Sequence, residues 1–208
     1  MSLRFLALVL VLAQFPNFAK EVSPGRDLGQ GLIYVRIVAL PADLPANPSG
    51  PAPACVVDVR YVQADRNRAV AFSAWLKFRA TVRSPVFVLA NRETAVELRR
   101  ALREAHRGTG IAVIGIAGPD FEPDVIVRST PENERAAYDV LGQGGPLAAL
   151  LTDHPDKIRN DEARLAQAPF SPLEDEPSAV AKSAEPVVDA TLQRAVHLHR
   201  TLLALRRN

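Results

Sequence analysis

Apolar runs rich in β-branched residues recur along the N-terminal two thirds of the chain, each bounded on at least one side by Gly or Pro. Such runs are typical of strands buried in a sheet, especially where both faces of the sheet are covered. We therefore expect five strands. They are Gly31–Leu40, Cys55–Val62, Pro85–Ala90, Ile111–Ala117 and the shorter Asp124–Arg128.

Amphipathic segments alternate with these runs. Apolar residues recur every three or four positions in Arg68–Arg79 and Arg92–His106, which predicts two helices, the second capped by Asn91. A third helix is expected to begin at Pro131, with Thr130 as its cap, and to end at about Leu141. Strands and helices that alternate through short connections predict an α/β domain with a largely parallel sheet.

The N-terminus predicts export. One positive charge at Arg4 precedes the apolar segment Phe5–Ala13, which is the arrangement of a secretory signal peptide. We expect cleavage after Ala19, with Ala13 as an alternative, and a periplasmic or extracellular mature protein. The segment is too short to span a bilayer, so no stable membrane span is expected after cleavage. The other interpretation is a buried N-terminal strand or helix.

Two segments lack a sustained period. Pro41–Pro53 contains five prolines and is expected to be a loop. Residues 153–186 are rich in Pro, Ala, Asp and Glu, which favours a flexible linker with one short helix near Asp161–Gln167. Asp189 then caps a final amphipathic helix. The expected organisation is a signal peptide at 1–19, an α/β core at 27–152, a linker at 153–186 and a C-terminal helix at 187–208.

Composition excludes several classes of protein. The chain has 208 residues, 48% hydrophobic and 23% charged, so it can bury a core. A net charge of +2 gives no reason to expect a nucleic-acid or anionic-membrane partner. Cys55 is the single cysteine, which excludes an internal disulfide and a cysteine-rich zinc site. An aromatic content of 6% disfavours a base-stacking platform or a sugar-binding sandwich.

Common cofactor and metal motifs are not found in the sequence. The glycines at 108–118 do not follow a strand and open a helix, as a dinucleotide-binding turn requires. His197 and His199 lie two apart on a helix and point in different directions, so they cannot chelate one metal. The arginines of Arg92–His106 alternate with glutamates, which favours a salt-bridged solvent face over a phosphate-binding surface. We therefore expect no cofactor and no metal.

The apolar runs, taken in order, resemble a known family. The matching segments are GLIYVRI (Gly31–Ile37), VVDVRYV (Val56–Val62), PVFVLANRETA (Pro85–Ala95), AVIGIAG (Ala112–Gly118) and PDVIV (Pro123–Val127). They are similar to the peptidase core of the C-terminal processing (tail-specific) serine peptidases, which have a crotonase-like fold. The segments Ser129–Leu141 and Pro186–Arg207 are similar to the C-terminal parts of exported bacterial members.

The resemblance implies a serine nucleophile at a helix N-terminus, a lysine base and an oxyanion site of backbone N–H groups. Here Val96 stands at the position of the serine, and valine has no heteroatom that could attack. Gln63 and Ala64 replace the pair of glycines that follows the D-x-R strand. Thr94 and His106 cannot substitute for the missing groups, because twelve residues of helix would hold them about 18 Å apart.

A lysine base is missing as well. The four lysines, which are Lys20, Lys77, Lys157 and Lys182, all lie outside the region between Thr94 and Asp156, where the family's hairpin supplies one. Asp58 and Arg60 remain as in the D-x-R motif, and we expect them to form hydrogen bonds at the strand end. Asn91 and Thr94 are expected to lie beside the degenerate site.

The sequence thus predicts a pseudo-peptidase without a catalytic residue that binds an extended peptide or protein segment. Two alternatives remain: an active serine-type peptidase with a divergent site, or an unrelated doubly wound α/β binding domain. No oligomeric state is predicted.

Overall fold

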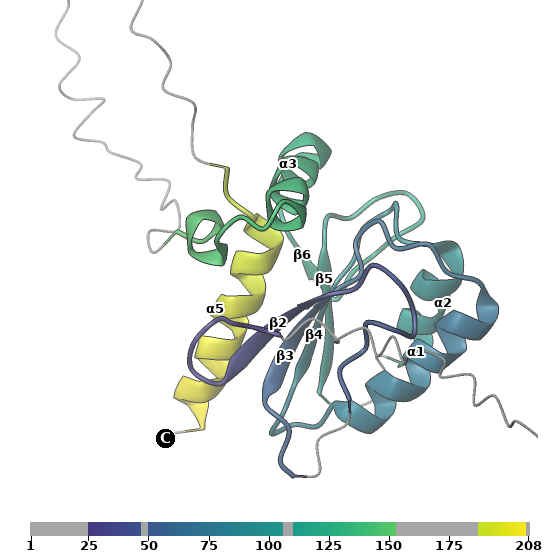
Figure 1. Ribbon diagram of the computed structural model, residues 1–208, viewed down its shortest axis with the longest axis horizontal. Helices are drawn as coiled ribbons and strands as arrows, with labels where there is room; N and C mark the ends of the chain where they lie inside the picture. Colours follow the sequence, from purple (N-terminus) through teal and green to yellow (C-terminus); the bar gives the residue numbers. More distant parts are fainter. Residues whose placement is uncertain (1–24, 47–49, 106–109, 153–186, 207–208) are drawn as a thin grey trace, which may run out of the picture.

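The computed structural model describes residues 25–46, 50–105, 110–152 and 187–206, and these form a three-layer α/β/α arrangement (Figure 1). The middle layer is a sheet of six strands whose spatial order follows their order in the chain. The first strand is antiparallel to the second, and all later neighbours are parallel. The strands are β1 (Arg26–Asp27), β2 (Leu32–Arg36), β3 (Ala54–Asp58), β4 (Val86–Leu89), β5 (Ile111–Gly115) and β6 (Val125–Ile126). The α/β class and the largely parallel sheet predicted from the sequence are confirmed.

Helices cover both faces of the sheet. The crossover helices α1 (Arg66–Arg79) and α2 (Val96–Ala105) pack on one face. The other face carries α3 (Pro131–Gly142), the short 3₁₀ helix η1 (Leu147–Leu150) and the C-terminal helix α5 (Ala190–Leu205). Two layers of helices explain why the strands are apolar throughout rather than alternating in polarity.

The two faces of the sheet support separate hydrophobic clusters. Alternate strand residues point to opposite faces, so Val57 and Val88 pack towards α1 and α2. Their neighbours Val56 and Phe87 pack towards α3 and α5. All four side chains are at most 2% exposed, which places the core on both sides of β3 and β4.

The start of α2 differs from the prediction. The Asn91 side-chain oxygen accepts the N–H groups of Glu93 and Thr94, as a helix cap would, but these residues form only a turn and no helix begins at Arg92. The N–H of Ala95 then donates to the carbonyl of Val62. These contacts use the N–H groups of residues 93–95 outside a helix, and α2 begins only at Val96.

Other predicted features are confirmed, although the strands are shorter than expected. Thr130 caps α3 by accepting the N–H of Asn133, and Asp189 caps α5 by accepting that of Leu192. The described part of the Pro41–Pro53 loop contains no strand or helix. The short elements β1 and η1 were not predicted from the sequence. The expected signal peptide, the whole linker with its short helix, and His106 lie outside the described residues.

No described helix has the length and apolar character needed to cross a bilayer.

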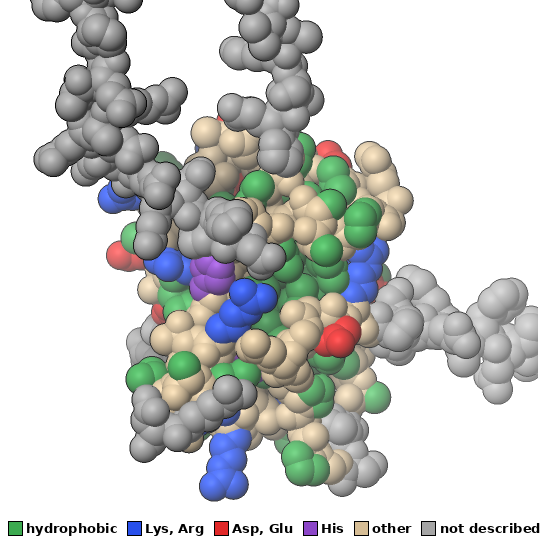
Figure 2. Space-filling view, turned by 90° about the vertical axis from the view of Figure 1, so that its left-hand side faces the viewer, with side chains coloured by type: hydrophobic (Ala, Val, Ile, Leu, Met, Phe, Trp, Pro, Cys, Tyr) green, Lys and Arg blue, Asp and Glu red, His purple; other side chains and the backbone are tan. Residues whose placement is uncertain are grey.

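The face of the molecule that carries α5 shows hydrophobic side chains gathered between scattered basic ones (Figure 2).

Candidate functional site

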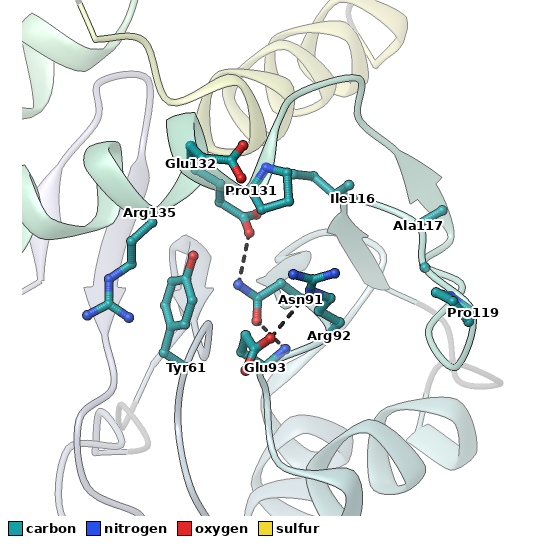
Figure 3. Close-up of a pocket in the computed structure, with 12 residues that line it drawn as sticks. Tyr61, Asn91, Arg92, Glu93, Ile116, Ala117, Pro119, Pro131, Glu132 and Arg135 are labelled. Carbon is teal, nitrogen blue, oxygen red and sulfur yellow. Dashed lines mark hydrogen bonds and ion pairs between the residues drawn. The ribbon is translucent and has the colours of Figure 1, made fainter.

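The carboxyl ends of the parallel strands open into a pocket of about 470 Å³, which we call the strand-end pocket (Figure 3). Ligands of open α/β sheets bind at this edge, because the loops that follow parallel strands meet there. The loops after β3, β4 and β5 and the first turn of α3 form its walls. The lining residues are Tyr61, Asn91, Arg92, Glu93, Ile116, Ala117, Gly118, Pro119, Pro131, Glu132, Glu134 and Arg135.

A buried ion-pair network lies behind this pocket. The guanidinium of Arg60 is fully buried and donates to Asp58 at the end of β3, with an Nη2–Oδ2 distance of 2.6 Å. It also donates to both carboxylate oxygens of Asp189, at 3.1 and 2.8 Å. The Tyr34 hydroxyl donates to Asp58 at 2.8 Å. Asp58 and Arg60 therefore do form the expected strand-end hydrogen bonds, and they also fix the N-terminus of α5.

A further carboxyl group, that of Glu134, reaches the pocket from α3. Its side chain is buried, and its two oxygens accept from the Asn91 amide at 2.9 Å and the Thr191 hydroxyl at 3.4 Å. Burial raises the pKa of Glu134, and the hydrogen bond from Asn91 opposes part of that increase. A carboxyl with a raised pKa beside a pocket is a candidate functional group.

Tyr61 also lines the pocket. Its backbone has a φ of 62°, a left-handed conformation that is uncommon for residues other than glycine and that concentrates at functional sites. The ring lies 4.8 Å from that of Tyr138 and 4.6 Å from the Arg135 guanidinium. Burial, with the nearby carboxylate of Glu134, raises the pKa of Tyr61 to about 12. At neutral pH the hydroxyl is therefore protonated.

Thr94 is beside the pocket but sealed from it. Its side chain is 1% exposed, and its hydroxyl donates to the Val59 carbonyl at 3.1 Å while accepting the Asn91 N–H at 3.1 Å. A hydroxyl with these contacts holds the 91–95 turn against the end of β3. It has no path to a substrate in this conformation.

A second hollow, the edge groove, lies between α2 and the outer edge of β6, and it has a volume of about 1120 Å³. Val96 and Ile126 both line this groove, and they are 56% and 55% exposed. Residues 117–119 line both the edge groove and the strand-end pocket, so the two hollows adjoin. The groove is lined by Val96, Arg99, Arg103, Ala117, Gly118, Pro119, Asp120, Phe121, Glu122, Pro123, Asp124 and Ile126.

Ile126, which lines this groove, lies on the free edge of β6. The Val127 N–H donates to the Gly115 carbonyl of β5 at 2.8 Å. Backbone groups of successive strand residues point to opposite sides, so the N–H and carbonyl of Ile126 point away from β5. Among the described strands, β6 is the last in the sheet and pairs with β5 alone.

The structure brings most of the predicted residues together. Asn91 lines the strand-end pocket. Asp58, Arg60 and Thr94 lie buried behind it. Gln63 is exposed and donates to the Glu93 carbonyl. Val96 instead faces the edge groove, and half-buried Ala64 packs against the core on the α1 side.

Sequence reasoning missed Tyr61, Glu134 and the pairing of Asp189 with Arg60. An acid in the first turn of a helix usually lies in solvent, where it stabilises the helix dipole, so nothing in the sequence marked Glu134 as buried. Tyr61 directly follows the D-x-R motif, and that position was the one available signal.

No three His, Cys, Asp or Glu side chains among the described residues are grouped as a metal site would need. In this part of the chain the one lysine is Lys77, in the last turn of α1. Comparisons of the chain with models of protein families, with curated proteins and with solved structures find no match.

Proposed function

We propose that this protein is an exported, non-catalytic relative of the C-terminal processing serine peptidases that binds an extended peptide or protein segment. One observation carries the proposal: Val96, at the position of the nucleophile in the resemblance, lines the same groove as the free edge of β6. A peptidase would present a reactive hydroxyl at this position, whereas here an apolar isopropyl group faces the groove.

Strand addition is the binding mode that this groove supports. An extended segment pairs with an exposed strand edge through main-chain hydrogen bonds, and side-chain contacts add specificity. Ile126 offers an outward N–H and carbonyl, while its side chain and that of Val96 supply apolar contact.

The alternatives have less support. An active peptidase with a divergent site needs a nucleophile, and the hydroxyl of Thr94 is buried and hydrogen-bonded. A doubly wound domain reverses its strand order within the sheet. The described strands instead follow one another in chain order from β1 to β6.

A binding assay tests the proposal. A labelled decapeptide that alternates Val with Ser should bind the full chain, as measured by fluorescence anisotropy. The same peptide methylated on alternate backbone nitrogens should bind much more weakly, because it cannot complete the ladder. Ile126→Pro removes the outward N–H, and edge strands tolerate proline at such positions.

We expect Ile126→Pro to weaken binding about fivefold or more, which corresponds to a net loss of about 1 kcal/mol for a hydrogen bond. The control Ile126→Val keeps the N–H and the β-branched shape and should bind as the unmodified protein does. Equal binding of the methylated peptide would exclude strand addition.

Catalysis is tested separately. The protein should not hydrolyse unstructured C-terminal peptides above a buffer blank, and fluorophosphonate probes should not label it. Stoichiometric labelling that is lost on mutation of a single Ser or Thr would overturn the non-catalytic assignment.

A further inference from the structure

The buried charged groups at and behind the strand-end pocket include more carboxyl groups than cations. Asp58 and Asp189 share a single guanidinium, that of Arg60. Glu134 adds a third carboxyl, and its own hydrogen-bond partners, Asn91 and Thr191, are neutral. If Glu134 is ionised, the formal charge of this buried group is −2, which an incoming cation would reduce.

The cations that line the pocket are already paired at its rim. The Nε of Arg92 lies 3.3 Å from a carboxylate oxygen of Glu93, and that of Arg135 lies 3.1 Å from Asp139. Both arginine side chains are more than half exposed. Glu132, in the first turn of α3, adds another carboxylate to the wall and forms no ion pair within the described residues.

The remaining walls are apolar and suit an alkyl chain. Ile116, Pro119, Pro131 and the ring of Tyr61 line the pocket. A volume of about 470 Å³ is within the range of small-ligand sites. The ring of Tyr61 already lies 4.6 Å from one guanidinium, and aromatic faces attract cations.

From this arrangement we propose that the strand-end pocket binds an organic cation, an alkyl ammonium or alkyl guanidinium group, with Glu134 as its counter-ion. An anionic ligand would meet the carboxyl groups of Glu134 and Glu132. A neutral amide would leave the excess of buried carboxyl groups unbalanced. The proposal does not depend on peptide binding in the edge groove, since Glu134 does not line that groove.

The cation could belong to a Lys or Arg side chain of a bound peptide or to a free alkyl amine, and the chemistry of recognition is the same. Calorimetric titration of the full chain with N-acetyl-arginine amide tests the proposal. The affinity is compared with that for N-acetyl-citrulline amide, which has nearly the same shape and no charge. We expect the arginine compound to bind at least about tenfold more tightly, a difference of about 1.4 kcal/mol. Butylguanidine identifies the source: affinity equal to that of the blocked amino acid indicates a free alkyl cation, and much weaker binding indicates a peptide side chain.

Variants locate the counter-ion. Glu134→Gln keeps an oxygen that can accept from Asn91, and it should lower affinity for the arginine compound about tenfold or more. Glu104→Gln changes an exposed carboxylate of α2 that lines neither hollow and should leave affinity unchanged. Binding should also release a proton in mildly acidic buffer, because the cation favours the ionised form of Glu134. The groups that act on that proton are Asn91, Asp58, Arg60 and Asp189.

Citrulline binding equal to that of the arginine compound would overturn the proposal, and so would no saturable binding of either. The comparison of the two compounds uses the unmodified protein, so it holds even if Glu134→Gln fails to fold. Loss of peptide binding in Ile126→Pro with retained arginine binding would separate the two sites.

Discussion

The buried ion pairs between β3 and α5 can be tested by changing the cation and one anion separately. Arg60→Met leaves the carboxylates of Asp58 and Asp189 in a site with almost no exposed surface. Removing one partner of a buried ion pair costs about 3–5 kcal/mol, because the remaining charge has no compensation. Asp189→Asn leaves a one-to-one pair of Arg60 with Asp58 and keeps an oxygen for the α5 cap. This variant weakens charge-assisted hydrogen bonds, so its free energy of unfolding should fall by about 1.5–3 kcal/mol.

Urea unfolding measures both variants. Trp75 is the single tryptophan and lies in α1, on the face of the sheet opposite α5, so its fluorescence reports on the other layer. Far-UV circular dichroism reports on all helices, and a transition that precedes the fluorescence change would indicate that α5 detaches first. The melting temperature of Arg60→Met should fall by about 6–20 °C, at about 2–4 °C per kcal/mol.

The order of the two effects decides whether the reasoning holds. Equal losses of stability in Arg60→Met and Asp189→Asn would refute the argument that uncompensated charge dominates. Asp189→Ala is the matched control for the cap, since it removes both functions. It should cost about 1 kcal/mol more than Asp189→Asn.

Further predictions concern single side chains. Val96→Ser should remain unlabelled by fluorophosphonate probes, because a hydroxyl without a base is a poor nucleophile; labelling would reveal a base. Burial raises the pKa of Glu134 above its ordinary 4.5, so the folded state holds this proton more tightly than the unfolded chain does. The resulting stabilisation is present below pH 4.5 and is lost as the pH rises through the folded pKa. Glu134→Gln should flatten this part of the stability profile measured by urea unfolding, and an unchanged slope would contradict the assignment. Burial raises the pKa of Cys55 to about 11, so a thiol reagent should label it about a hundredfold or more slowly than the urea-unfolded chain. Equal rates would mean that the core opens readily. Thr94→Val removes the hydroxyl that donates a hydrogen bond to the Val59 carbonyl. The free energy of unfolding, measured in urea, should fall by about 1–3 kcal/mol. An unchanged free energy of unfolding would show that the 91–95 turn does not need this hydrogen bond.

The sequence by itself determined the α/β class and most element positions, because these depend on interactions between near neighbours. Apolar runs predicted β2 to β6, since strands covered on both faces need no polar alternation. Thr130 and Asp189 can be predicted as helix caps from residue type and position, because a cap accepts a backbone N–H only two or three residues ahead. In the structure each accepts the N–H three residues further along the chain. The D-x-R pair could likewise be expected to form hydrogen bonds, because Asp58 and Arg60 lie on the same strand end.

Only the tertiary structure decided where α2 begins and which groups form the candidate sites. The Ala95 N–H donates to the Val62 carbonyl, which lies beyond β3, and no local pattern predicts that contact. Asp189 and Arg60 are 129 residues apart, so the cap residue gains its ion pair only when α5 packs against β3. Glu134 is buried because α3 lies over the end of β4, where Asn91 donates to it. The local sequence fixes which residues a helix or strand presents, whereas packing between distant elements determines which charges lose their contact with water.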